Sequence, residues 1–235
     1  ISALFLFFLR YCKETAVISL ISKSGSLKNC FDEFFKKCAS FDAVICSNDF
    51  AAVSLIRNLL KIAPDELNRL KILSCAQTKL SGYYKNMLTS VNMNFEQYGK
   101  AAVFIYEKLK AHPYMSGITV TVKWTGENEK TPQHKTVTVN NSESGYEFYA
   151  DGDMRNMLTA EQILNTCSDS DRLIIMSLIS GMTIEETAGH CFLTEGGVKY
   201  RIKRILNECK LSDKSELLTL LKDYLNPIIP KTPEL

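Results

Sequence analysis

The sequence has few of the residues that metal centres and disulfide frameworks need. It contains three histidines, and the only one beside another ligand-type residue is His190, which precedes Cys191. Its eight cysteines are scattered, with no CxxC pair, and several lie in apolar runs such as AVIC (43–46). This usage indicates reduced core thiols in a cytoplasmic protein rather than disulfides or a zinc site.

A long apolar run and an excess of one charge are also absent. The opening ISALFLFFL ends at Arg10, which is too short to span a bilayer, and it has no basic segment before it. We expect a buried helix there and no membrane partner. The chain does not begin with Met, which predicts that further sequence precedes residue 1. With a net charge of +2, any surface for nucleic acid must be local.

Catalytic signatures are missing too. No GxSxG, HExxH, GxGxxG or GxxxxGK[ST] pattern occurs. His190 is expected to be structural and Cys191 to be a core thiol, while Asp169 and Asp171 precede a helix and fit dipole capping better than acid–base work. We therefore expect a protein that is not an enzyme and uses no cofactor.

What is present between residues 15 and 124 is an alternation of strand and helix patterns. Continuous apolar strands are expected at 41–49 and 71–76, and a short extended piece is expected at 90–93. Helical patterns cover 2–13, 27–38, 50–62 and 94–112, and β patterns cover 15–22 and 118–124. Continuous apolar strands favour a parallel sheet buried on both faces, so this part predicts a doubly wound α/β domain.

The remainder changes character. Residues 126–156 are polar and turn-rich, and predict a linker with an extra strand at 134–140. From 157 onward the pattern is all-helical, with helices expected at 158–167, 169–181, 183–191, 195–208 and 215–225. Gly181 is expected to end a helix in the left-handed region, Thr183 and Glu186 to form a capping box, and Thr194 to cap the next helix.

The stretch TEGGVKYRIKRI (194–205) concentrates positive charge. Val198, Ile202 and Ile205 recur at helical spacing and predict a buried face, which leaves Lys199, Tyr200 and Lys203 on the opposite face. Alone, such a helix fits a solvated face, a membrane-surface helix or the reading helix of a DNA-binding domain. A short turn before it, preceded by another helix, favours helix-turn-helix geometry.

Over residues 172–221 the sequence resembles the LuxR-type (GerE-like) helix-turn-helix domain. The motifs that carry the resemblance are Gly181-Met182-Thr183, Glu186-Thr187-Ala188, Thr194-Glu195, Val198-Lys199, Ile205-Leu206, Leu211-Ser212 and Ser215-Glu216-Leu217. The resemblance implies that Lys199, Tyr200 and Lys203 face the major groove. Thr194, Arg201 and Arg204 are expected to contact phosphates. Region 4 of sigma factors has a similar four-helix arrangement.

Residues 1–124 resemble part of the effector domain of LacI-type regulators, which is similar to periplasmic sugar-binding proteins. The matching features are strand-Asn-Asp-helix at 43–60, Pro64-Asp65-Glu66, Thr89-Ser90-Val91 and the helix with Tyr98-Gly99-Lys100-Ala101-Ala102. The resemblance implies that Asp49, with Asn48 beside it, contacts an effector such as a sugar; the alternative is that one of them only caps the helix at 50–62. The acid that the family carries after the next strand is missing here, and about one lobe of the family's two is present.

Together these patterns predict an α/β fold: a partial periplasmic-binding-protein-like lobe (1–125), a linker (126–156) and a four-helix LuxR-type domain (157–235). The predicted function is a cytoplasmic, effector-responsive transcription regulator that binds double-stranded DNA as a homodimer. The alternatives are a small-molecule-binding module whose C-terminal helices contact protein, an α/β enzyme with an appended helical domain, and a sigma-region-4-like DNA-binding protein.

Overall fold

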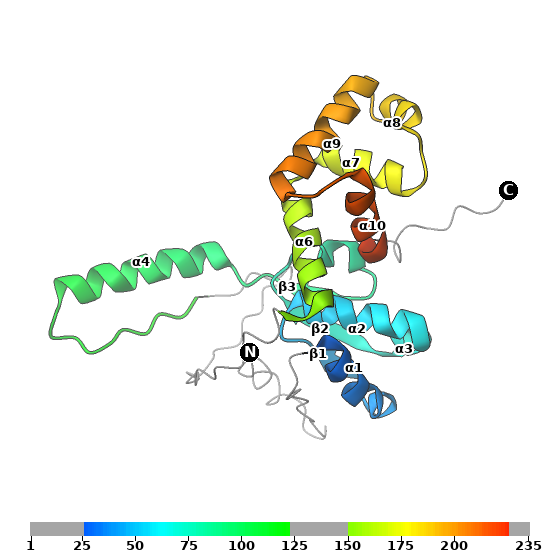
Figure 1. The fold of residues 1–235 in the computed structure, drawn as a ribbon. Helices are drawn as coiled ribbons and strands as arrows, with labels where there is room; N and C mark the ends of the chain where they lie inside the picture. Colours follow the sequence, from blue (N-terminus) through cyan, green and yellow to red (C-terminus); the bar gives the residue numbers. More distant parts are fainter. Residues whose placement is uncertain (1–25, 123–149, 226–235) are drawn as a thin grey trace.

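The structure is a computed structural model that describes residues 26–122 and 150–225 (Figure 1). The helix expected at 2–13 and the strands expected at 15–22 and 134–140 lie outside the described residues. The described part is α/β, with one small parallel sheet and many helices.

The sheet has three strands in the order β1-β2-β3: β1 (Ala43–Ile45), β2 (Lys71–Cys75) and β3 (Thr89–Val91). Both pairings are parallel, as the apolar strand patterns predicted, with Val44 opposite Ile72 and Ser74 opposite Ser90. Since parallel neighbours end at the same edge, the residues that come after β1, β2 and β3 meet there.

Helices α1 (Leu27–Phe35), α2 (Asp49–Ile62) and α3 (Glu66–Arg69) accompany this sheet, together with short 3-10 turns η2 (Cys38–Ser40) and η3 (Ser81–Tyr84). Asn48 caps α2, because its side chain accepts a hydrogen bond from the N–H of Ala51 at 2.9 Å. Most of α2 is buried, and its fully buried apolar members are Ala52, Val53, Ile56 and Leu59. This helix is therefore the central layer between the sheet and the C-terminal helices.

Helix α4 (Phe95–Ala111) leaves this body and projects away from it (Figure 1). The prediction of a strand at 118–124 is wrong for residues 118–122, which form no strand. An alternating sequence becomes a strand only when a neighbour supplies the hydrogen-bond ladder, and none of the described strands lies beside it.

The C-terminal helices are α6 (Gly152–Thr166), α7 (Asp169–Ile179), α8 (Ile184–His190), α9 (Glu195–Cys209) and α10 (Lys214–Leu225). Their bounds agree with the expected helices within two residues, except that α6 starts six residues early. Asp151 caps it by accepting from the N–H of Met154 at 3.0 Å. The predicted domain boundary at 156/157 thus falls inside a helix.

One hydrophobic core runs through both parts. It includes Leu27 and Ile56 of the α/β part, Met157 and Ile163 of α6, and Leu221 of α10. The hydroxyl of Tyr84 donates to the backbone carbonyl of Tyr224 within this core. The α/β part and helices α6 and α10 are therefore one packed body.

The seven described cysteines are free thiols, and five of them are buried. Burial raises the pKa of Cys46 to about 12, with smaller contributions from Cys30 and Asp49. Among residues 26–122 and 150–225, no cluster of three or more His, Cys, Asp or Glu side chains is arranged to hold a metal ion.

Candidate nucleic-acid interface

Helices α7, α8 and α9 form a helix-turn-helix unit with well-defined ends. Gly181 has a φ of +98°, the left-handed conformation expected after α7. Thr183 and Glu186 form the predicted capping box at α8: the Thr183 hydroxyl accepts from the N–H of Glu186, whose carboxylate accepts from the N–H of Thr183. The hydroxyl of Thr194 accepts from the N–H of Gly197 at 3.1 Å and so caps α9.

The turn between α8 and α9 exposes a large aromatic side chain. Phe192 has a φ of +55°, and 96% of its surface is exposed. A left-handed aromatic residue is uncommon because its Cβ crowds the following carbonyl. The adjacent backbone is nonetheless bonded, since the N–H of Leu193 donates to the carbonyl of Ala188 at 2.9 Å.

One face of α9 is buried as the sequence predicted. Val198 and Ile202 pack with Ile174, Leu178 and Ala188 in a small cluster between α7, α8 and α9. Ile205, one turn later, instead joins the large core. This packing fixes which side of α9 is left for solvent.

The opposite face carries Lys199, Tyr200 and Lys203, and all three are exposed as predicted. Tyr200 is 70% exposed. Lys199 forms an ion pair with Glu195, one turn earlier, at 2.9 Å. Such a pair between exposed side chains on a helix contributes little to stability, so a phosphate or a base edge can compete for the lysine.

Arg201 and Arg204 occupy different surroundings from those expected. Arg201 Nη1 lies 2.9 Å from Asp171 Oδ1, and Arg204 Nη2 lies 2.6 Å from Asp171 Oδ2. Each arginine side chain is 33% exposed. That both flank the reading face and contact phosphates stays a prediction; in the structure their guanidinium groups neutralise a buried carboxylate inside the unit.

Asp171 itself is fully buried at the start of α7. It also completes a capping box with Ser168. Burial raises the pKa of the Asp171 carboxyl, but hydrogen bonds from Ser168 and Arg201 and the charge of Arg204 outweigh it, so the pKa is lowered overall. The capping prediction for Asp171 is confirmed, while its second role as the anchor for α9 was missed. A single aspartate in the sequence does not indicate that its partners are arginines 30 and 33 residues further along the chain.

His190 is engaged structurally, as expected. Its Nδ1 lies 2.9 Å from the hydroxyl of Ser177, which connects the end of α8 to α7. Thr187, between these helices, is fully buried, and its hydroxyl has no hydrogen-bond partner among the described residues. A buried hydroxyl without a hydrogen-bond partner lowers stability, because it has given up its hydrogen bonds to water.

The residues expected to contact an effector both serve the fold. Asn48 caps α2, while Asp49 is fully buried. Its carboxylate accepts hydrogen bonds from the hydroxyls of Ser74 (2.6 Å), Ser90 (2.6 Å) and Thr78 (3.0 Å), and from the N–H of Thr78 (2.7 Å). Asp49 thus joins α2 to the ends of β2 and β3, and no ligand can reach it in this structure.

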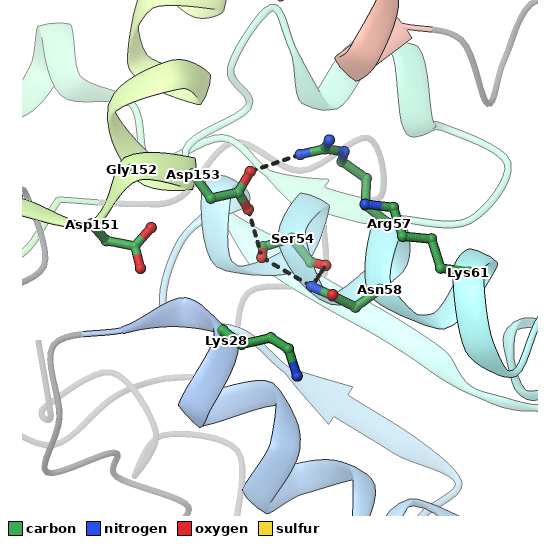
Figure 2. Close-up of a pocket in the computed structure, with 8 residues that line it drawn as sticks. All are labelled: Lys28, Ser54, Arg57, Asn58, Lys61, Asp151, Gly152 and Asp153. Atoms are coloured by element: carbon green, nitrogen blue, oxygen red, sulfur yellow. Dashed lines mark hydrogen bonds and ion pairs between the residues drawn. The ribbon is translucent and has the colours of Figure 1, made fainter.

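A different cavity lies where the α/β part meets α6 (Figure 2). It has a volume of about 240 Å³ and is lined by Lys28, Ser54, Arg57, Asn58, Lys61, Asp151, Gly152 and Asp153. The lining comes from α1, α2 and the start of α6, so any ligand there would touch both parts.

Arg57 forms the wall of this cavity nearest the core. Its guanidinium lies 2.8 Å from Asp153 and 2.5 Å from Asp223, and its central carbon lies 3.8 Å from the ring centre of Tyr224. The hydroxyl of Tyr224 also donates to Asp153 at 2.6 Å. One side chain of α2 therefore holds both α6 and α10.

No family model matches this chain, and no curated protein matches it. In the part of the chain that the structure describes, no helix has the length and apolar character needed to cross a membrane. Function is therefore inferred from the geometry of the site.

Proposed function

We propose that the protein is a DNA-binding transcription regulator that responds to a small molecule, with α9 reading the major groove. The observation that carries this proposal is the exposed face of α9, where Lys199, Tyr200 and Lys203 stand opposite the buried Val198 and Ile202. A capped helix that comes after a short turn and presents cationic side chains suits insertion into the groove.

Asp171 supports this proposal indirectly. By pairing with Arg201 and Arg204 it fixes the rotation of α9 about its own axis, so Lys199 and Lys203 keep one direction. The reading face then consists of the two lysines and Tyr200, the same three residues that the sequence resemblance implies. We also propose that the helical part is a LuxR-type domain and that the α/β part is a LacI-type effector lobe.

The test uses the whole chain, because α6 and α10 share a core with the α/β part. Binding to a mixed pool of DNA duplexes is followed by fluorescence anisotropy between about 50 mM and about 200 mM salt. We expect salt-sensitive binding that the double variant Lys199→Ala/Lys203→Ala weakens about 10- to 100-fold.

The matched control is Lys36→Ala/Lys37→Ala, which removes the same charge at the exposed end of α1. It should leave binding within about twofold, since long-range effects of exposed charges are screened by salt. Equal weakening by both variants would mean that only net charge matters. If wild type binds the DNA no more tightly than Lys199→Ala/Lys203→Ala does, the proposal is wrong.

The effector response is assigned in this proposal to the cavity of Figure 2. Its hydroxyl, amide, ammonium and carboxylate groups are those that bind polar ligands such as sugars. Its 240 Å³ volume is below the roughly 300 Å³ at which drug-sized pockets begin, which favours a small ligand. A panel of monosaccharides would be screened by thermal unfolding.

A ligand in this cavity should raise the unfolding temperature of wild type and of Asn68→Leu, an exposed control on α3. It should have no effect on Asn58→Leu, which replaces an amide in the cavity wall with an apolar group. If a sugar stabilises all three proteins equally, its site is elsewhere.

A second candidate function is protein contact through the C-terminal helices, favoured by the exposure of Phe192. It predicts DNA binding that does not respond to the two lysines. The anisotropy titration of the lysine variant therefore decides between the two functions.

A further inference from the structure

The charged groups that line the cavity of Figure 2 differ in how many partners they have inside the protein. Three of them are cations, Lys28, Arg57 and Lys61, and two are carboxylates, Asp151 and Asp153. A group that is already hydrogen-bonded must give up that contact before it can bind a ligand. The groups without such a contact therefore indicate which ligand chemistry the cavity takes.

The carboxylate of Asp151 is used by the fold. Its Oδ2 accepts a hydrogen bond from the N–H of Leu27 at 3.1 Å, and its Oδ1 accepts one from the N–H of Met154 at 3.0 Å. These two bonds join the start of α1 to the start of α6. A ligand hydroxyl would have to compete with both backbone groups for this carboxylate.

Asp153 and Arg57 are also paired inside the protein. Asp153 Oδ1 accepts from Arg57 at 2.8 Å and from the hydroxyl of Tyr224 at 2.6 Å, and its Oδ2 accepts from the hydroxyl of Ser54 at 3.1 Å. Arg57 also donates to Asp223 at 2.5 Å. Only 7% of the Arg57 side chain is exposed, so its charge is neutralised by the protein itself.

Lys61 is the exception among these charged groups. It lies in the last turn of α2, and no residue within 26–122 or 150–225 forms a hydrogen bond or an ion pair with its ammonium group. Lys28, which reaches the cavity from α1, is paired only with Asp32. That pair is exposed and contributes little to stability, so an anion can replace it. The cavity can thus take up an anion without breaking a buried contact.

Asn58 supplies a neutral acceptor one turn before Lys61 on the same side of α2. Its Nδ2 donates to the carbonyl of Ser54 at 2.8 Å and lies 3.4 Å from the Ser54 hydroxyl. Among the described residues, none donates to its Oδ1. This oxygen is therefore free to accept a hydrogen bond from a ligand hydroxyl.

We propose that this cavity binds a small hydroxylated acid, whose carboxylate or phosphate lies on Lys61 and one of whose hydroxyls donates to Asn58 Oδ1. The inference rests on the effector role in the proposed function and names the class of effector. An ammonium group only donates, so Lys61 gains most from an acceptor that carries negative charge. A neutral sugar would leave the charge of Lys61 without a counter-ion.

The test compares acidic sugars with their neutral parents in thermal unfolding of the full chain. The probes are glucose, glucuronate and glucose 6-phosphate, and galactose, galacturonate and galactose 6-phosphate. The dependence of the unfolding temperature on probe concentration gives an apparent affinity. We expect at least one acid to bind wild type about tenfold or more tightly than its neutral parent, because hydrogen bonds to charged groups are the stronger ones. Comparison of the two acid types separates a carboxylate from a phosphate ligand.

The variants test whether Lys61 causes this preference. Lys61→Met should bind the acid no more tightly than its neutral parent, while Lys71→Met, at the exposed start of β2, should keep the preference of wild type. Lys61→Glu should reverse the preference and bind glucosamine more tightly than glucose.

Two results would overturn the inference and leave the effector role in place: an acid preference that Lys61→Met retains, and equal binding of neutral and acidic sugars by wild type. If none of the probes stabilises wild type, the inference and the assignment of the effector to this cavity are both wrong. DNA binding by α9 is measured separately and does not depend on that outcome.

Discussion

The buried carboxylate of Asp171, at the start of α7, lies 2.6 Å from the guanidinium of Arg204, at the middle of α9. Arg201 reaches the other oxygen of the same carboxylate. A single acid thus connects the first helix of the helix-turn-helix unit to the helix that we propose reads DNA.

Replacing Asp171 by Asn should lower the free energy of unfolding by about 2 to 3 kcal/mol, because two guanidinium groups lose their counter-charge at a buried site. Urea unfolding measures this change. Asp169→Asn is the control, since Asp169 is 99% exposed two residues earlier and should change stability by less than about 0.5 kcal/mol. If both variants lose the same free energy of unfolding, the loss comes from the helix dipole and not from the pairing with the arginines.

The same carboxylate predicts how stability depends on pH. Because folding lowers the pKa of Asp171, its contribution is complete above the unfolded value of 3.8 and is lost as the pH falls from there through the folded pKa. Below about pH 4, wild type should therefore lose stability more steeply than Asp171→Asn. Parallel pH profiles of the two proteins would contradict the pairing.

Thr187 gives a prediction of the opposite sign. Its buried hydroxyl has no partner in the described part of the chain, so Thr187→Val should raise the free energy of unfolding by about 1 kcal/mol. The comparison is Thr183→Val, which removes the α8 cap and should lower it by about 1 kcal/mol. A stability loss in Thr187→Val would mean that the hydroxyl has a partner in solution.

Asp49 should behave as part of the fold. Asp49→Ala leaves the hydroxyls of Ser74, Thr78 and Ser90 without their shared acceptor, and we expect a loss of about 3 kcal/mol in chemical unfolding. Asp65→Ala, at an exposed position before α3, should have little effect. A stable Asp49→Ala protein that fails to bind a sugar would instead support the effector role predicted from the sequence.

Arg57 should contribute to the stability of a molecule that unfolds as one unit. Wild type should unfold in a single transition, because the core is continuous between the α/β part and the C-terminal helices. Arg57→Met removes the ion pairs with Asp153 and Asp223 and should cost about 2 kcal/mol. Arg155→Met, on the exposed side of α6, is the control, and two transitions in wild type would contradict the shared core.

Much of the local structure could be predicted because its causes are local. The Thr183–Glu186 capping box and the Thr194 cap depend on side chains within three residues of the backbone groups they serve, and Gly181 is left-handed because it has no Cβ. The same holds for the buried face of α9, where the spacing of Val198 and Ile202 is sufficient. The exposure of Lys199 and Lys203 results from that spacing.

What the sequence did not show depends on partners that are distant along the chain. Arg201 and Arg204 have the composition of phosphate contacts, and only the fold brings Asp171 between them. Asp49 has the sequence position of a ligand contact, yet β2 and β3 supply donors that fill its carboxylate. The segment 118–122 has a strand pattern but no strand to pair with.

The sequence by itself therefore determined most of the helices, their caps and the cationic face of α9, since each depends on neighbours along the chain. Only the tertiary structure decided which partners the buried charges have. It also decided that the α/β part packs against α6 and α10, with Arg57 between them. The physical reason is that a charge enters a core only with a partner, and that partner is chosen by packing rather than by sequence distance.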